Sequence, residues 1–252
     1  MIIEDLNQVN QENAGVMAFG FFDSIHLGHR EVIRSAVHLA KEMGTISSVF
    51  LFKNNIYPLL GIEKSPIYSF EERINLIRTL GVDAIYYVDA DQEFLSLSPE
   101  DFLSDLQSKL DIKGFACGRD FTFGHMGKGT VNDLIRLLKV DHCVVDLLEI
   151  DADKVSSERV RSALRMGDLP LVKRFLGRDF AIERPVLRGR TDGGKMGFPT
   201  INVDLLSVPL CEGVYFTDVI VDCVRYQAVT NVGSHPTFSD MRVNIESHLL
   251  SF

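Results

Sequence analysis

Two hydrophobic periods alternate along the first two-thirds of the chain, and together they predict a series of strands and helices. Short apolar runs with the length of buried strands occur at residues 15–21, 46–52, 84–88, 114–118 and 142–148. Apolar residues recur at helical spacing in the segments 29–43, 69–81, 98–110, 130–138, 156–167 and 168–177. Strands that alternate with helices imply a parallel sheet covered on both faces. We therefore predict a Rossmann-like α/β domain over residues 1–177.

Two of these helices carry start signals that do not depend on hydrophobicity. Ser69 is followed three residues later by Glu72, which is the spacing of a capping box. Ser98 precedes Pro99, and proline is favoured at the first position of a helix. Both helices are therefore predicted to begin at these serines.

The pattern changes after Gly177, where long helical periods stop. The segments 213–222, 225–233 and 242–250 are rich in β-branched and aromatic residues. We predict a second, all-β domain over residues 178–252.

Composition narrows the choice of partners. A net charge of −9 argues against nucleic acid as a partner, because phosphate backbones bind basic surfaces, although a small phosphorylated ligand remains compatible. The four cysteines are scattered without a CxxC pair, and the N-terminus is polar and acidic. These features, with no apolar run long enough for a membrane span, predict a cytoplasmic protein that binds small molecules.

The sequence HLGH, residues 26–29, follows the first predicted strand and opens the first predicted helix. Ligands of parallel α/β sheets bind at this position, and a helix N-terminus favours phosphate. His26 and His29 are therefore candidate phosphate donors, and Gly28 allows a close approach of the backbone. Two solvated loop histidines are the alternative explanation.

A second polar motif stands near the end of the predicted sheet. In VSSERVRSAL, residues 155–164, two serines precede a helix and an arginine follows within it. Serines at the start of a helix are most often simple N-caps, which is the local explanation for Ser156 and Ser157. HxGH followed by a motif of the form ISSTxxR is typical of the nucleotidylyltransferase superfamily.

Further segments make the resemblance more specific. CGRDFTFGHMGKGT, residues 117–130, resembles a GxDFxFG loop, and GKMGFPTINVDL, residues 194–205, resembles the riboflavin kinase signature GRxLGFPTANL. NVGSHPTF, residues 231–238, and IESHLLSF, residues 245–252, resemble two more segments of the same domain. The chain thus resembles the bacterial bifunctional riboflavin kinase/FMN adenylyltransferases, or prokaryotic FAD synthetases.

This resemblance implies an enzyme that uses ATP and Mg²⁺ to convert riboflavin to FMN and FMN to FAD, with the second domain an antiparallel β-barrel. It makes His26, His29 and Glu246 catalytic, with Glu246 as the base for the ribityl hydroxyl. Thr200 and Asn202 would hold Mg²⁺. The nucleotide-binding positions would be Gly20, Asp23, Gly28, Asp120, Ser156, Ser157, Arg161, Lys195, Gly197 and Pro199. For Asp23 and Asp120, roles in helix entry and in a turn are the local alternatives.

Several positions depart from the family pattern. Asn54 and Asn55 occupy the place of a proline and a histidine, and Glu158 replaces a threonine, which puts an acid near the expected triphosphate. The family also continues beyond the last segment, so the second domain is expected to lack its C-terminal part. An enzyme with one active half, or a weakly catalytic flavin-binding or nucleotide-binding protein, therefore remains an alternative.

Overall fold

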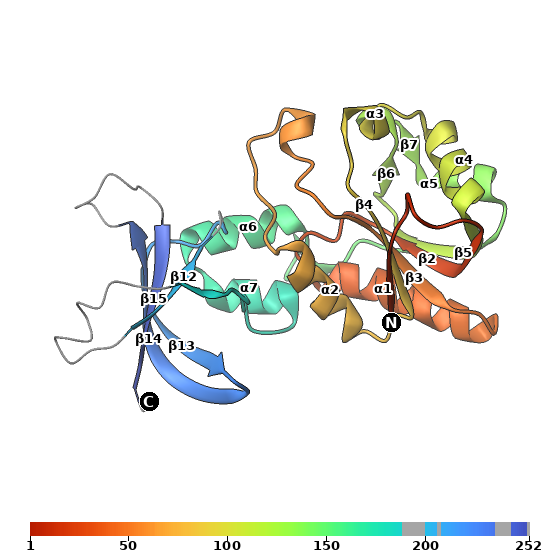
Figure 1. Ribbon diagram of the computed structural model, residues 1–252. Coiled ribbons are helices and arrows are strands. Elements are labelled where there is room, and N and C mark those ends of the chain that lie inside the picture. The colour runs from red at the N-terminus through yellow and green to blue at the C-terminus, as the bar shows by residue number, and fades with distance from the viewer. Residues whose placement is uncertain (188–199, 206–207, 235–242, 251–252) are drawn as a thin grey trace.

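The computed structural model describes residues 1–187, 200–205, 208–234 and 243–250. Within these ranges the chain forms a parallel α/β part and a separate antiparallel sheet, with two helices between them (Figure 1). No described helix is both long enough and apolar enough to cross a membrane.

The first sheet has six parallel strands in the order β1-β4-β3-β2-β5-β8. Their bounds are Ile2–Asp5 for β1, Glu12–Phe19 for β2, Ser47–Phe52 for β3, Ala84–Val88 for β4, Leu110–Gly118 for β5 and Asp141–Val145 for β8. The strand β1 was not predicted. It is short and acidic, and it becomes a strand by pairing with β4 more than 70 residues away, which no local pattern signals.

Helices cover both faces of this sheet, as predicted. On one face α1 (Leu27–Glu42) and α2 (Phe70–Arg78) bury residues such as Ile33 and Ile77. On the other face α4 (Pro99–Lys109) and α5 (Val131–Leu138) bury residues such as Leu106 and Leu134, beside the short α3 (Gln92–Leu95). The predicted α/β class is confirmed, and the two cores fix the sheet from both sides.

Both predicted helix starts are present. The amide of Glu72 donates to Ser69 Oγ over 3.2 Å, and the amide of Ser69 donates to Glu72 Oε2 over 2.7 Å, which completes the capping box. Ser98 caps α4 by accepting from the amide of Asp101 over 3.0 Å, and Pro99 is the first helical residue.

Small two-stranded sheets and two further helices complete the α/β part. The pairs are β6 (Thr122–Phe123) with β7 (Gly129–Thr130), and β9 (Glu149–Ile150) with β10 (Asp153–Lys154). The helices α6 (Ser157–Met166) and α7 (Leu169–Leu176) then pack on Ile67 and Tyr68, and α7 ends at Gly177 with a left-handed backbone (φ 66°). Glycine adopts this conformation without a steric cost, so the helix stops there.

The second sheet is antiparallel, in the order β11-β12-β15-β14-β13. Its strands are β11 (Val186–Leu187), β12 (Thr200–Asp204), β13 (Gly213–Val221), β14 (Val224–Ser234) and β15 (Val243–Leu249). One face packs a small core that includes Val232 and Ile245. The predicted antiparallel architecture is confirmed, and the described strands form an open sheet with β11 and β13 at its edges.

A stretch that we call the strap, residues 178–184, connects α7 to the second sheet and lies against the first domain. Its Phe180 ring lies 5.6 Å from the ring of Tyr68, and Phe180 also packs on the core of the second sheet. The amide of Glu183 and the guanidinium of Arg184 both bind Glu72 Oε1, over 2.7 Å and 2.6 Å. The carboxylate that caps α2 therefore also anchors the strap.

Candidate functional site

A cavity of about 300 Å³ opens at the carboxyl ends of β2 and β5, in the centre of the parallel sheet. The strand order reverses between these two strands, because β2 leads to β3 on one side and β5 leads to β8 on the other. Such switch points are where open α/β sheets bind ligands. Gly20 at the end of β2 and Gly118 at the end of β5 both line the cavity.

His26 joins this cavity to the start of α1. It is the N-cap residue, and its Nδ1 accepts a hydrogen bond from the amide of His29 over 3.1 Å. Because Nδ1 is an acceptor, the neutral ring carries its proton on Nε2. Burial lowers the pKa of His26 to about 4, so at neutral pH the ring is an uncharged donor rather than a cation.

His29 stacks on His26 in the same cavity wall. The two ring centroids are 3.7 Å apart, and the edge of Phe22 contacts the other side of the pair. Burial, and to a smaller degree His26, holds the pKa of His29 well below its ordinary value. Among the described residues its buried Nδ1 has no hydrogen-bond partner, which fits a polar atom that a ligand satisfies.

This geometry predicts that both rings stay neutral when mildly acidified. We expect the ring signals of His26 and His29 in ¹H–¹⁵N spectra to stay constant between about pH 8 and about pH 5.5, below the ordinary histidine range. Because the unfolded chain takes up these protons first, the two histidines should lower folded-state stability as the pH falls through that range. A midpoint near 6.5 for either ring would contradict the assignment.

The opposite wall of the cavity comes from α6. Ser156 caps this helix by accepting from the amide of Arg159 over 3.3 Å, and the hydroxyl of Ser157 lies 3.0 Å from that of Ser24. Ser156, Ser157, Gly28 and both histidines all line the same cavity. Two helix N-termini therefore meet at one cavity, and each offers free amides and partial positive charge to a phosphate.

Asp120 lies at the mouth of the cavity, where its Oδ2 accepts from Lys154 Nζ over 2.7 Å. Lys154 also lines the cavity and places a positive charge beside the start of α6. Sequence analysis missed Lys154, although its position two residues before Ser156 was a signal. The Asp120–Lys154 pair makes one side of the cavity mouth polar. Phe121, on the same loop as Asp120, makes another part of the mouth apolar.

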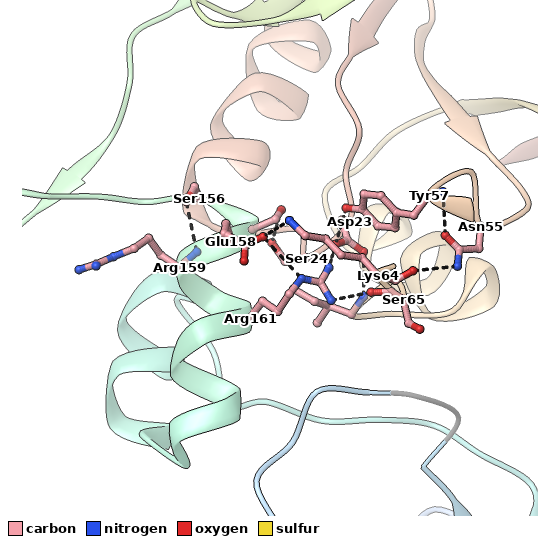
Figure 2. A network of polar contacts seen from close by, with 12 residues as sticks. Asp23, Ser24, Asn55, Tyr57, Lys64, Ser65, Ser156, Glu158, Arg159 and Arg161 are labelled. Carbon is pink, nitrogen blue, oxygen red and sulfur yellow. Dashed lines mark hydrogen bonds and ion pairs between the residues drawn. The ribbon is translucent and has the colours of Figure 1, made fainter. Parts of the chain in front are cut away.

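Asp23 and Arg161 lie beneath this cavity and do not line it. Arg161 Nη2 donates to Asp23 Oδ2 over 2.7 Å, and both side chains are almost fully buried (Figure 2). The amide of Ile67 and the hydroxyl of Tyr57 also donate to Asp23, over 2.8 Å and 3.3 Å. In this structure the pair ties the loop after β2 to α6, and its predicted contact with nucleotide stays a prediction.

The buried ion pair predicts a large effect on stability. Asp23→Asn removes the buried carboxylate that pairs with Arg161, so we expect a loss of about 3 to 5 kcal/mol in the free energy of unfolding. The matched control is Asp179→Asn, which breaks an exposed pair with Lys173 and should cost about 1 kcal/mol or less. Urea unfolding of the full chain checks both. Equal effects of the two variants would show that Asp23 and Arg161 do not stabilise the loop.

Glu158 does not point its charge at the cavity. Its Oε2 accepts from Lys64 Nζ over 2.6 Å and lies 3.9 Å from Arg161 Nε, as Figure 2 shows. Lys64 is held in turn by its own loop, because Asn55 Nδ2 donates to its carbonyl oxygen over 3.2 Å. Two departures from the family pattern therefore offset each other. The loop with Asn55 holds Lys64, and Lys64 neutralises the carboxylate of Glu158.

The second sheet gathers three of the predicted kinase residues on one face. Asn202 lies directly opposite Glu246 in the pairing of β12 with β15, and Thr200 lies opposite His248. Asn231 on β14 flanks Glu246 from the other side. Residues paired across strands, and residues two apart along one strand, share a face. Asn231 and His248 were not predicted, although both belong to segments that carry the resemblance.

The oxygen donors on this face suit a hard cation. Thr200 offers a hydroxyl and Asn202 an amide carbonyl, and Mg²⁺ binds oxygen ligands of this kind. Lys195, Gly197 and Pro199, predicted to bind nucleotide, lie outside the described residues.

Comparisons with known proteins give a family for each of the two parts of the chain. Residues 8–159 match the family model of FAD synthetase, and residues 176–252 match that of riboflavin kinase. The bifunctional riboflavin kinase/FMN adenylyltransferase of Bacillus subtilis is 36% identical over 97% of this chain and 81% of its own length. The protein of the same name from Escherichia coli K12 is 32% identical over 98% and 82%. A crystal structure titled a macrolide-efflux protein, from Streptococcus pneumoniae, has a TM-score of 0.86 at 27% identity, over 100% of this chain and 86% of that one.

The fold and the first cavity define a parallel α/β domain in which two helix N-termini and a pair of histidines meet at one cavity. With its second, antiparallel sheet the chain has the two-domain plan of a flavin-nucleotide enzyme. The chain belongs to the FAD synthetase family and carries a riboflavin kinase domain, which confirms the resemblance seen in its sequence.

Proposed function

We propose that this chain makes FAD from riboflavin in two ATP-dependent steps, at two sites that belong to residues 1–177 and 178–252. As a member of its family it is a riboflavin kinase and FMN adenylyltransferase, an enzyme of FAD biosynthesis with riboflavin, FMN and ATP as substrates. The observation that carries the adenylyl-transfer site is the meeting of two helix N-termini and two stacked histidines at one cavity.

In adenylyl transfer, a phosphate oxygen of FMN attacks the α-phosphorus of ATP. A new P–O bond forms, the bond to the β-phosphate oxygen breaks, and pyrophosphate leaves. Negative charge grows on the oxygens around the α-phosphorus, so fixed donors aimed at them lower the barrier. His26 supplies a neutral N–H for this purpose, His29 supplies a second ring, and the amides at the starts of α1 and α6 hold the phosphates.

In the kinase step, a ribityl hydroxyl of riboflavin attacks the γ-phosphorus of ATP and ADP leaves. Glu246 accepts the hydroxyl proton, while Thr200 and Asn202 hold Mg²⁺. When bound, Mg²⁺ neutralises charge that develops on the phosphates. Lys195, Gly197 and Pro199 contact the nucleotide.

The test is product analysis of the full chain. The chain is incubated with ATP and Mg²⁺, once with riboflavin and once with FMN, and the flavins are separated by chromatography. We expect FMN and then FAD from riboflavin, and FAD from FMN. If FAD forms from FMN but riboflavin gives no FMN, or if riboflavin gives FMN but no FAD forms, only one half is active. If flavin binds measurably and no product forms, the chain is a binding protein.

A further inference from the structure

Arg178 is the first residue of the strap, and it reaches back into the loop that carries the histidines. It lies in the stretch that matches the riboflavin kinase model. Its Nη1 donates to the carbonyl oxygen of Ile25 over 2.8 Å, and its Nη2 donates to that of Ser24 over 3.1 Å. These two carbonyls immediately precede His26. A residue assigned by sequence to the second domain thus binds the backbone of the first site.

The loop that Arg178 binds is strained. Phe22 and Ile25 have left-handed backbones, with φ of 47° and 46°, which bulky and β-branched side chains rarely adopt. Both side chains are buried, so the carbonyls of this loop have little access to water. Such conformations persist only where surrounding contacts hold them, and bonds from a charged guanidinium are among the stronger ones available.

Close contacts fix the end of α7 against the start of α1, and this holds Arg178 in place beside the loop. Leu27, the first residue of α1, lies so close to Gly177 that a Cβ there would come within 2.5 Å of the leucine side chain. Arg30 Nη1 also donates to the carbonyl oxygen of Leu176, over 3.3 Å. The guanidinium of Arg178 lies 5.5 Å from the centre of the Tyr68 ring, which supports it from another side.

We propose that Arg178 is a positioning residue for adenylyl transfer, which fixes the Ser24–Ile25 backbone so that His26 and His29 face the phosphates. The proposal rests on the function proposed above for this cavity. It makes the first site depend on the strap, because within the described part of residues 1–177 no side chain donates a hydrogen bond to these two carbonyls. Arg178 itself does not line the cavity.

The experiment uses full-length Arg178→Ala with Arg184→Ala as the matched control, since Arg184 is the other arginine of the strap and binds Glu72. Both are assayed for FAD formation from FMN and ATP and for FMN formation from riboflavin. We expect Arg178→Ala to lower kcat for FAD formation about 10- to 100-fold, the scale of a small misplacement of reacting groups. Its FMN formation and the FAD formation of Arg184→Ala should stay parental. Added guanidinium ion should restore part of the lost kcat in Arg178→Ala alone.

A second readout does not require turnover. In ¹H–¹⁵N spectra of the ligand-free protein, the ring signals of His26 and His29 should move in Arg178→Ala, return towards their parental positions with guanidinium, and stay unchanged in Arg184→Ala. Parental kcat in Arg178→Ala, an equal loss in Arg184→Ala, or unmoved ring signals would each overturn the proposal. If Arg178→Ala does not fold, Arg178→Lys decides, because one ammonium cannot bridge both carbonyls with the same geometry. Parental kcat and ring signals in that variant would also overturn it. A parent that forms no FAD would refute the proposed function instead, and the spectra would still test Arg178.

Discussion

Replacing His29 with alanine is expected to lower the rate of FAD formation about 10²-fold or more, while FMN formation from riboflavin stays at the parental rate. A donor aimed at charge that appears only in the transition state has an effect of this size. The ring lines the cavity and stacks on His26, so its loss removes one donor and the surface that orients the other. The two activities separate because the histidine lies on α1 of the α/β part and Glu246 lies on β15 of the antiparallel sheet.

The control for this variant lies on the same helix. His38→Ala removes an exposed histidine of α1 that pairs with Glu42 over 3.4 Å, and it should leave both activities unchanged. Initial rates of both reactions, measured for each variant with purified FMN and riboflavin, decide the matter. Parental FAD formation by His29→Ala would remove this histidine from the chemistry.

Replacing Glu246 with glutamine is expected to lower FMN formation by about 10² to 10⁴, the usual range for the loss of a general base. Glutamine keeps the size and the hydrogen-bonding capacity of the side chain but does not accept the ribityl proton. Glu246 lies between Asn202 and Asn231 on one face of the sheet, so the base and the proposed Mg²⁺ ligands are cross-strand neighbours. Affinity for ATP should change little, because the glutamate acts on the hydroxyl and not on the nucleotide.

Asp218→Asn provides the same change of charge two strands away, on the edge strand β13, where the aspartate pairs with the exposed Arg225. It should keep parental FMN formation. The comparison requires a parent with measurable kinase activity, followed by steady-state rates at saturating ATP. FMN formation at the parental rate by Glu246→Gln would assign the proton transfer to another group.

Local signals in the sequence were sufficient where the cause of the structure is local. The capping box at Ser69, the proline-initiated helix at Pro99 and the stop at Gly177 each depend on residues within one turn, and all three are present. The resemblance of both motifs to one family implied that the two histidines and the two serines act on the same nucleotide, and all four residues line one cavity.

Contacts between distant segments could not be predicted in this way. Asp23 and Arg161 are 138 positions apart, and nothing in either motif indicates that the two side chains bind each other. The contact of Arg178 with Ser24 spans 154 positions and involves a backbone carbonyl, which carries no sequence signature. Sequence patterns identified the polar residues, and packing decided whether each of them faces the cavity or supports it from behind.

The two anchors of the strap have different consequences for chimeric enzymes assembled from halves of two relatives. Arg178 binds main-chain carbonyl oxygens, and the first half of any relative has these oxygens whatever its side chains are. Arg184 instead binds the side chain of Glu72, whose other oxygen caps α2, so this contact survives recombination only if both parents encode a compatible pair. A chimera joined at Gly177 should therefore keep the contact of Arg178 with the loop before His26 for any pair of parents. It should keep the contact of Arg184 with Glu72 only where the two parents match. Mismatched halves should fail first by fraying α2, at the face of the sheet opposite α4 and α5.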